Sequence, residues 1–153
     1  MKVPRVAGAA RLAMCLGLLA GCSPGAAPPP QTALSMKELM ERVVDPSADV
    51  FWLASGTIIT AKGEASRAPT TDAGWEAAVN AAATLVESGN LLMLPGRARE
   101  GREWAVYARQ LASAAAAGMT AAQAKDARAV FETGGEIYVA CRSCHMKYVL
   151  GYE

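Results

Sequence analysis

The side chains best suited to chemistry lie together near the end of the 153-residue chain, in Cys141-Arg142-Ser143-Cys144-His145. Two thiols three residues apart, followed directly by an imidazole, are the attachment pattern of a c-type haem. On one helical turn, the thiols of Cys141 and Cys144 can form thioether bonds to the two vinyl groups of a haem. The imidazole of His145 is then the proximal ligand of the iron. We therefore expect one covalent haem c.

Other uses of a Cys-x-x-Cys pair compete with this interpretation. The pair taken alone could form a disulfide or half of a zinc site. A structural zinc ion requires four ligands, whereas the chain after residue 33 offers two cysteines and one histidine. A thioredoxin-like redox site would require a βαβ pattern, and the sequence contains none. The haem interpretation is therefore preferred.

The first 21 residues read as a secretory signal peptide. Three basic residues precede an apolar run over 12–20, which is too short for a membrane span of about 20 residues. The run ends in Leu19-Ala20-Gly21-Cys22, which resembles the lipobox of bacterial lipoproteins. This resemblance implies a lipid on Cys22 and a location on the periplasmic side of a bacterial membrane. An ordinary cleaved signal and an uncleaved anchor are the alternatives.

A Pro/Ala-rich linker is expected over 22–33, because its triple proline favours an extended chain. The folded domain should then span 34–153. Loss of residues 1–21 removes three basic residues, so the formal net charge changes from +1 to −2. Neither value is the basic excess of a nucleic-acid-binding protein, and no nucleic-acid partner is expected.

Composition favours an all-α fold. Alanine, the best helix former, occupies 33 positions, and aromatic residues make up only 6% of the chain. Ser35-Met36-Lys37-Glu38 has the pattern of a capping box and predicts a helix over 35–54, kinked or broken at Pro46. The patterns also predict helices over 72–94, over 99–117 and from Thr120 onward. Residues 55–71 should be a long connection, because the strand-like Thr57-Ile58-Ile59-Thr60 has no evident partner. Short turns between the last three helices predict an up-and-down antiparallel four-helix bundle.

Apolar and small residues repeat along the predicted helices. The last helix should place Phe131, Gly134 and Tyr138 on the same inward stripe as Cys141 and His145. Its Gly134-Gly135 pair should either break the helix or admit something bulky beside the backbone. The third helix should face inward with Trp104, Ala108, Leu111 and Ala115.

The end of the last helix resembles that of the cytochrome c′ family, the class II cytochromes c that include the cytochrome c556 branch. In that family Cys-x-x-Cys-His-x-x-Tyr closes the fourth helix, and this chain matches the pattern through Tyr148. The resemblance covers about 34–150 and implies a haem attached near the C-terminal end of helix four. Family members often have a basic residue after the tyrosine, where this chain has Val149. Lys147 is close to His145 in the sequence, but its side chain should lie on a different face of the helix.

The distal side of the haem decides its chemistry. His145 is the only histidine, so a second histidine ligand from the same chain is excluded. In the family the first helix supplies the distal residue, and a methionine there gives six-coordinate iron. Met36 and Met40 lie one turn apart on that helix, and Met40 is preferred because it is nearer the helix centre. Both methionines could instead be core fillers.

Two functions follow from these alternatives. A methionine ligand raises the reduction potential and suits a membrane-tethered electron carrier with redox-protein partners. A five-coordinate iron behind an apolar wall suits a protein that binds NO or CO. No catalytic set of residues is evident, so an enzyme is not expected. The family resemblance also implies that two copies of the chain can associate as a homodimer.

Other residues near the motif have less specific roles. Tyr138 and Tyr148 should line the haem pocket. The three tryptophans, Trp52, Trp75 and Trp104, are expected to belong to the hydrophobic core. Three arginines near the start of the third helix could reach the haem propionates, but a solvated face is preferred; they are Arg97, Arg99 and Arg102.

Overall fold

The computed structural model describes residues 29–151, and these residues form a mostly helical fold. In chain order the elements are α1 (Met36–Leu39), the π-helical turn η1 (Met40–Val44), α2 (Asp45–Leu53), β1 (Thr57–Thr60), β2 (Gly63–Ser66), α3 (Asp72–Leu92), α4 (Arg102–Gln123) and α5 (Ala127–Tyr148). The predicted signal peptide, the start of the linker and Cys22 lie outside the described residues.

The first helical run begins at the predicted capping box. The Ser35 hydroxyl accepts a hydrogen bond from the Glu38 amide, and the Glu38 carboxylate accepts one from the Ser35 amide. The run is not broken at Pro46, because it continues through η1 and α2 to Leu53. Proline lacks an amide donor and its ring crowds the carbonyl four residues earlier. The wider turn of η1, in which the Asp45 amide reaches the Met40 carbonyl, precedes the proline directly.

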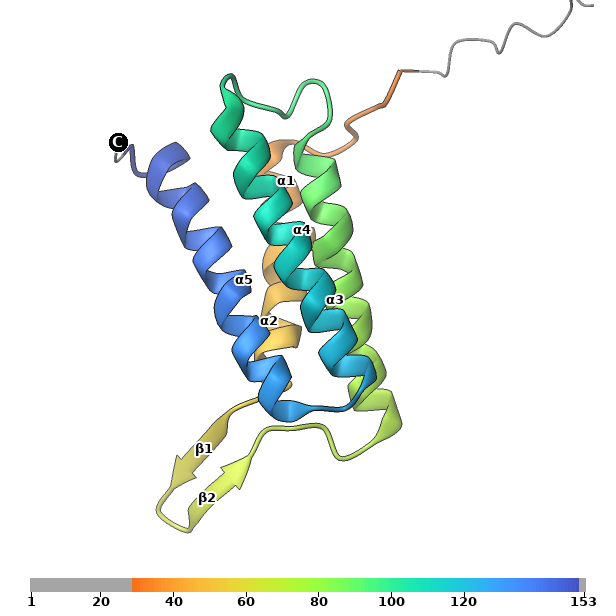
Figure 1. Cartoon of the computed structure of the whole chain (residues 1–153), viewed down its shortest axis with the longest axis vertical. Coiled ribbons are helices and arrows are strands. Elements are labelled where there is room, and N and C mark those ends of the chain that lie inside the picture. Colours follow the sequence, from red (N-terminus) through yellow and green to blue (C-terminus); the bar gives the residue numbers. More distant parts are fainter. Residues whose placement is uncertain (1–28, 152–153) are drawn as a thin grey trace, which may run out of the picture.

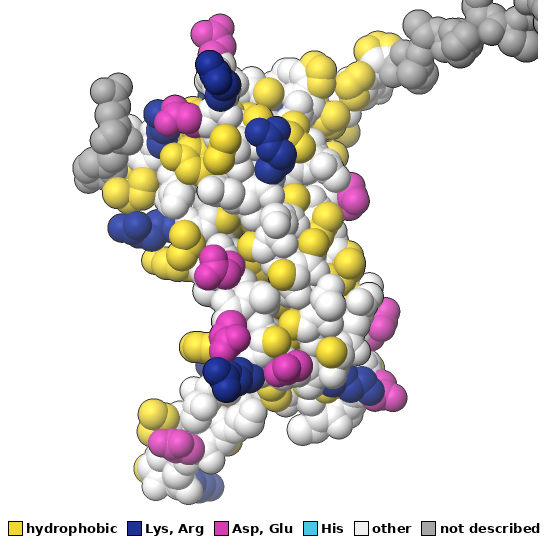
Figure 2. Space-filling model, in the orientation of Figure 1, with side chains coloured by type: hydrophobic (Ala, Val, Ile, Leu, Met, Phe, Trp, Pro, Cys, Tyr) yellow, Lys and Arg dark blue, Asp and Glu magenta, His cyan; other side chains and the backbone are white. Residues whose placement is uncertain are grey.

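The predicted long connection is wrong for part of its length, because β1 has a partner. β1 and β2 pair antiparallel, with Thr57 opposite Ser66 and Thr60 opposite Gly63. Gly63 has φ of +114°, which the tight turn requires and which glycine adopts without strain. The sequence did not predict β2, because its residues, Gly-Glu-Ala-Ser, have low strand propensity. All eight strand residues are exposed, and the hairpin projects from one end of the helices (Figures 1 and 2).

The predicted boundary between the third and fourth helices is also wrong. α4 continues past Gly118 to Gln123, so Thr120 does not open a helix. Asp126 caps α5 instead, and its carboxylate accepts hydrogen bonds from the Arg128 and Ala129 amides. Gly118 is retained inside α4 because Phe51 packs on it: a Cβ there would lie 2.6 Å from the Phe51 ring.

The helices form a bundle in which neighbours run in opposite directions. α2 packs against α3 and α5, and α4 packs against α3 and α5 (Figure 1). The predicted inward face of α4 is confirmed, since Trp104, Ala108, Leu111 and Ala115 are all buried. α3 and α4 approach closely at Gly89, where a Cβ would lie 2.6 Å from the Ala108 carbonyl oxygen.

The predicted inward stripe of α5 is right at Gly134, which is buried, and wrong at Phe131 and Tyr138. Phe131 and Tyr138 are exposed by 63% and 56%, and Val130, Ile137 and Ala140 are buried in their place. The Gly134-Gly135 pair does not break the helix. Trp52 of α2 packs on Gly134 and donates a hydrogen bond from its indole nitrogen to the Gly134 carbonyl, at 2.9 Å.

The surface carries both signs of charge. Figure 2 shows acidic and basic side chains mixed over the visible face, with no field of one sign. Within residues 29–151, none of the helices is both long and apolar enough to cross a membrane.

Candidate functional site

An apolar cavity of about 360 Å³ opens between α2, α4 and α5, with η1 at one side. This volume lies within the usual range of small-molecule and cofactor pockets. Eighteen residues line it: Met40, Val44, Asp45, Ala48, Trp52, Leu92, Trp104, Tyr107, Ala108, Leu111, Tyr138, Ala140, Cys141, Arg142, Cys144, His145, Met146 and Leu150. The sequence motif therefore borders the cavity.

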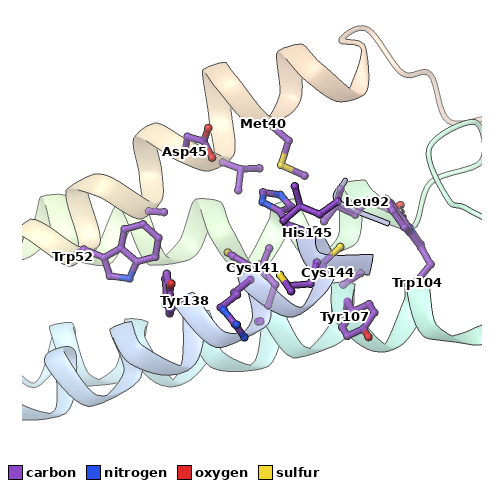
Figure 3. Close-up of a pocket in the computed structure, with 18 residues that line it drawn as sticks. Met40, Asp45, Trp52, Leu92, Trp104, Tyr107, Tyr138, Cys141, Cys144 and His145 are labelled. Atoms are coloured by element: carbon purple, nitrogen blue, oxygen red, sulfur yellow. Dashed lines mark hydrogen bonds between the residues drawn. The ribbon is translucent and has the colours of Figure 1, made fainter. Parts of the chain in front are cut away.

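Cys141, Cys144 and His145 lie in the last two turns of α5 and all line this cavity (Figure 3). Both cysteines have free thiols and are half-buried. His145 is exposed, and its carbonyl accepts the amides of Val149 and Leu150 at the helix end. The helical turn thus presents two thiols and one imidazole to the same space.

Both thiols are held in their neutral form. Burial raises the pKa of Cys141 to about 11, and the nearby Cys144 and Asp45 add to the rise. Burial also raises the pKa of Cys144. Redox-active cysteines in dithiol motifs have lowered pKa values, because the thiolate is the nucleophile. The environment of this pair is the opposite of the one that activates a thioredoxin-like site.

The structure separates the two candidate methionines. Met40 begins η1 and points into the cavity opposite α5, whereas Met36 does not line it (Figure 3). Met36 packs against the core and borders a different hollow near the start of α1. Of the two, Met40 alone shares a space with Cys141, Cys144 and His145. Met146 also lines the cavity, but it directly follows His145 on the same helix.

Aromatic rings form two walls. Trp52 and Tyr138 meet edge to face at one end, with ring centres 6.4 Å apart. At the other end Tyr148 packs edge to face on Trp104, at 4.9 Å, and lies behind the lining. Trp104 donates a hydrogen bond to the Leu92 carbonyl at 2.8 Å, which fixes its indole. Two of the three tryptophans therefore border the cavity, and Trp75 belongs to the core as expected.

Several lining residues were not singled out from the sequence. Tyr107 lies three residues after Trp104 and four before Leu111, so the spacing on α4 would have indicated it. Asp45 is the only acidic side chain in the lining, and Arg142 the only arginine. The sequence did not predict that Asp45 lines the site, because an aspartate directly before Pro46 resembles a helix cap.

Lys147 and the three arginines near the start of α4 lie outside the cavity. Lys147 forms an ion pair with Glu103 of α4, and hydrogen bonding to that carboxylate raises the Lys147 pKa. Lys147 therefore points away from the cavity lining, as predicted. The solvated face expected for the arginines is wrong for Arg97, which is buried, and right for Arg99 and Arg102. None of the three lines this cavity.

No protein-family model, curated protein or solved structure matches the chain. Within residues 29–151, no group of three or more His, Cys, Asp or Glu side chains is arranged to hold a metal ion. The donor set in the cavity is two thiols, one imidazole and the thioether sulfurs of Met40 and Met146, within an apolar lining. This set fits a covalently attached haem.

Proposed function

We propose that the chain is a membrane-tethered c-type cytochrome of the cytochrome c′ type, which carries electrons through one covalent haem. One observation carries the proposal: Cys141, Cys144, His145 and Met40 line the same apolar cavity. The residues follow the attachment motif, and the fold around them is a helical bundle. The proposed partners are redox proteins at a membrane surface.

Each side chain has a defined part in this proposal. Cys141 and Cys144 would hold the group covalently through their sulfur atoms, and the His145 imidazole would bind its iron. Bound haem supplies an iron that alternates between Fe(III) and Fe(II). The Met40 sulfur would be a second protein ligand of the iron, and a methionine ligand would raise the reduction potential. Trp52, Trp104 and the aliphatic residues exclude water from the site, which also sets the potential.

The location rests on Cys22, which lies outside the described residues. The proposed lipid on this cysteine would hold the domain at the periplasmic side of a bacterial membrane. Mass measurement of the mature protein tests this part. A Cys22→Ser variant should lose the lipid and leave the membrane fraction without any change in the haem spectrum.

The two methionines provide the test of the haem site. The wild-type protein should show covalent haem on a denaturing gel and a low-spin spectrum in both redox states. Met40→Ala should convert the spectrum to high spin and lower the reduction potential. Met36→Ala is the matched control, because it removes the same side chain one turn away and outside the cavity. Its spectrum should be unchanged.

Three results would count against the proposal. A high-spin wild-type spectrum that shifts with NO or CO would favour the gas-binding alternative. Equal spectra for the wild type and Met40→Ala would remove Met40 as a ligand. Lack of covalent haem in the wild type, with Cys141→Ala/Cys144→Ala as the negative standard, would overturn both haem functions.

A further inference from the structure

A second hollow, of about 320 Å³, lies at the end of the bundle where the chain enters α1. It is formed by the start of the first helical run and by the loop that joins α3 to α4 (Figure 1). Its lining residues are Thr32, Leu34, Ser35, Met36, Gly96, Arg97, Ala98 and Arg99. It shares none of them with the cavity of the proposed haem site.

Arg97 is the unusual residue of this hollow, because its side chain is charged and almost fully buried. Only 7% of Arg97 is exposed. No acidic side chain within the described part of the chain lies within ion-pair distance of it; the pairs found there involve Lys37, Lys125, Arg128 and Lys147. A buried charge is costly unless it is paired.

The hydrogen bonds of Arg97 leave its charge uncompensated. One terminal nitrogen donates to the Leu34 carbonyl at 2.9 Å, and the other reaches the Leu91 carbonyl at 3.5 Å. Both acceptors are neutral. The Nε–H is buried and has no partner among residues 29–151. The end of α3 contributes a partial negative charge of about half a unit, less than the full charge of a guanidinium.

The other groups around Arg97 suit an anion. Arg99 is a second arginine in the lining, Thr32 is also there, and no acidic side chain lines the hollow. Glu38 is the first acid along the first helix, and its carboxylate accepts hydrogen bonds from the Ser35 amide and hydroxyl, at 3.0 and 2.8 Å. Paired guanidinium groups match the oxygen geometry of a phosphate.

We propose that this hollow binds a phosphate group, supplied either by inorganic phosphate or by the headgroup of an anionic phospholipid. Nine residues separate Cys22 from Thr32, so the chain between them cannot span more than about 35 Å. A lipid on Cys22 would therefore keep the hollow near a membrane surface. Headgroup binding would then set which end of the bundle faces the membrane. The phosphate site itself does not depend on the haem proposal.

The test uses the mature chain from residue 22 with Cys22→Ser, so that a lipid anchor does not itself bind vesicles. Inorganic phosphate should shift the Arg97 Nε–H signal in a nitrogen–proton NMR spectrum, with saturation at millimolar concentration. Arg99→Gln should weaken binding about tenfold, the usual effect of losing one charge-assisted hydrogen bond. Arg102→Gln is the matched control, because Arg102 is exposed, lies beside the loop and does not line the hollow.

Vesicles distinguish the two sources of phosphate. With a headgroup as ligand, the protein should bind phosphatidylglycerol vesicles more tightly than vesicles made equally anionic by a carboxylate lipid, and phosphate should compete. With inorganic phosphate as ligand, the NMR shift should occur and both vesicles should bind equally weakly. Either pattern supports the phosphate site, provided that Arg99→Gln weakens it and Arg102→Gln does not.

Three outcomes would overturn the proposal. One is an Arg97 signal that does not respond to millimolar phosphate. Another is an equal loss of binding in Arg99→Gln and Arg102→Gln, which indicates diffuse surface charge. The third is phosphate binding by the haem-free Cys141→Ala/Cys144→Ala chain but not by the haem-loaded chain, which assigns the hollow to the propionates of the haem. The haem-free chain is measured in parallel, so the phosphate site can still be tested if the haem proposal fails. The test substitutes Arg99 and Arg102, which are both exposed, so it does not depend on the folding of an Arg97 variant.

Discussion

The space between α2, α4 and α5 is filled at one end and open at the other. At the hairpin end, the rings of Phe51 and Trp52 pack directly on Gly118 and Gly134. Towards the C-terminal end of α5, Met40 faces Cys141 and Cys144 across the cavity, which Val44 also lines (Figure 3). The first helical run, α4 and α5 therefore build a solid core in one half and a pocket in the other.

The difference lies in how side-chain size is distributed along the helices. Two large rings meet two residues without side chains, so volume is conserved at the filled end. Trp52 also borders the cavity and is bonded to the backbone of α5, so it sets the distance between α2 and α5. Protein interiors are normally packed without such voids, which makes an apolar cavity beside reactive side chains a candidate ligand site.

The largest effect is expected at the open end, in the rate at which the Cys141 thiol is alkylated. In the haem-free folded chain at pH 8, Cys141 should react with iodoacetamide roughly a hundredfold more slowly than a thiol of pKa 9.0, because its pKa is about 11. The rate should rise about tenfold per pH unit up to the pKa, since only the thiolate reacts. Mass spectrometry of the modified peptide gives the rate.

Chain unfolded in urea is the control for this measurement, because unfolding removes the burial of the thiol. If the folded and unfolded chains react at the same rate at pH 8, the open end is not an apolar environment. The contrast between the two ends would then rest on shape alone.

The filled end should be sensitive to added volume. Gly118→Ala should lower the free energy of unfolding by about 1–3 kcal/mol, because the new Cβ would lie 2.6 Å from the Phe51 ring. Gly135→Ala is the matched control: its Cβ meets nothing within 4 Å, so it should stabilise the helix by up to about 1 kcal/mol. Urea denaturation measures both changes. Equal effects of the two substitutions would contradict tight packing on Gly118.

The smallest effect is expected at the border between the two ends. Trp52→Phe removes the indole donor to the Gly134 carbonyl and should cost about 1 kcal/mol. It should also extend the cavity towards the hairpin, which xenon binding would detect. Tyr138→Phe provides the comparison, because Tyr138 is 56% exposed at the same border and should change stability little. A larger loss in Tyr138→Phe than in Trp52→Phe would show that Trp52 does not separate the two ends.

Features set by neighbouring residues could be predicted from the sequence. The Ser35–Glu38 capping box and the inward face of α4 are confirmed, because both depend on spacing within one helix. The hairpin was missed because β2 has a composition that disfavours strands. The end of α4 was misplaced because glycine usually weakens a helix, whereas packing against Phe51 stabilises this one across the core.

The site divides in the same way. By itself, the sequence determined that two thiols and an imidazole come together, because three residues on one turn of α5 are adjacent in any fold that keeps the helix. Tertiary structure decided that Met40, and not Met36, lies opposite them. Local spacing places both methionines on the same stripe. The height and rotation of the first helical run against α5 depend on distant contacts, such as Trp52 with Gly134 and Phe51 with Gly118.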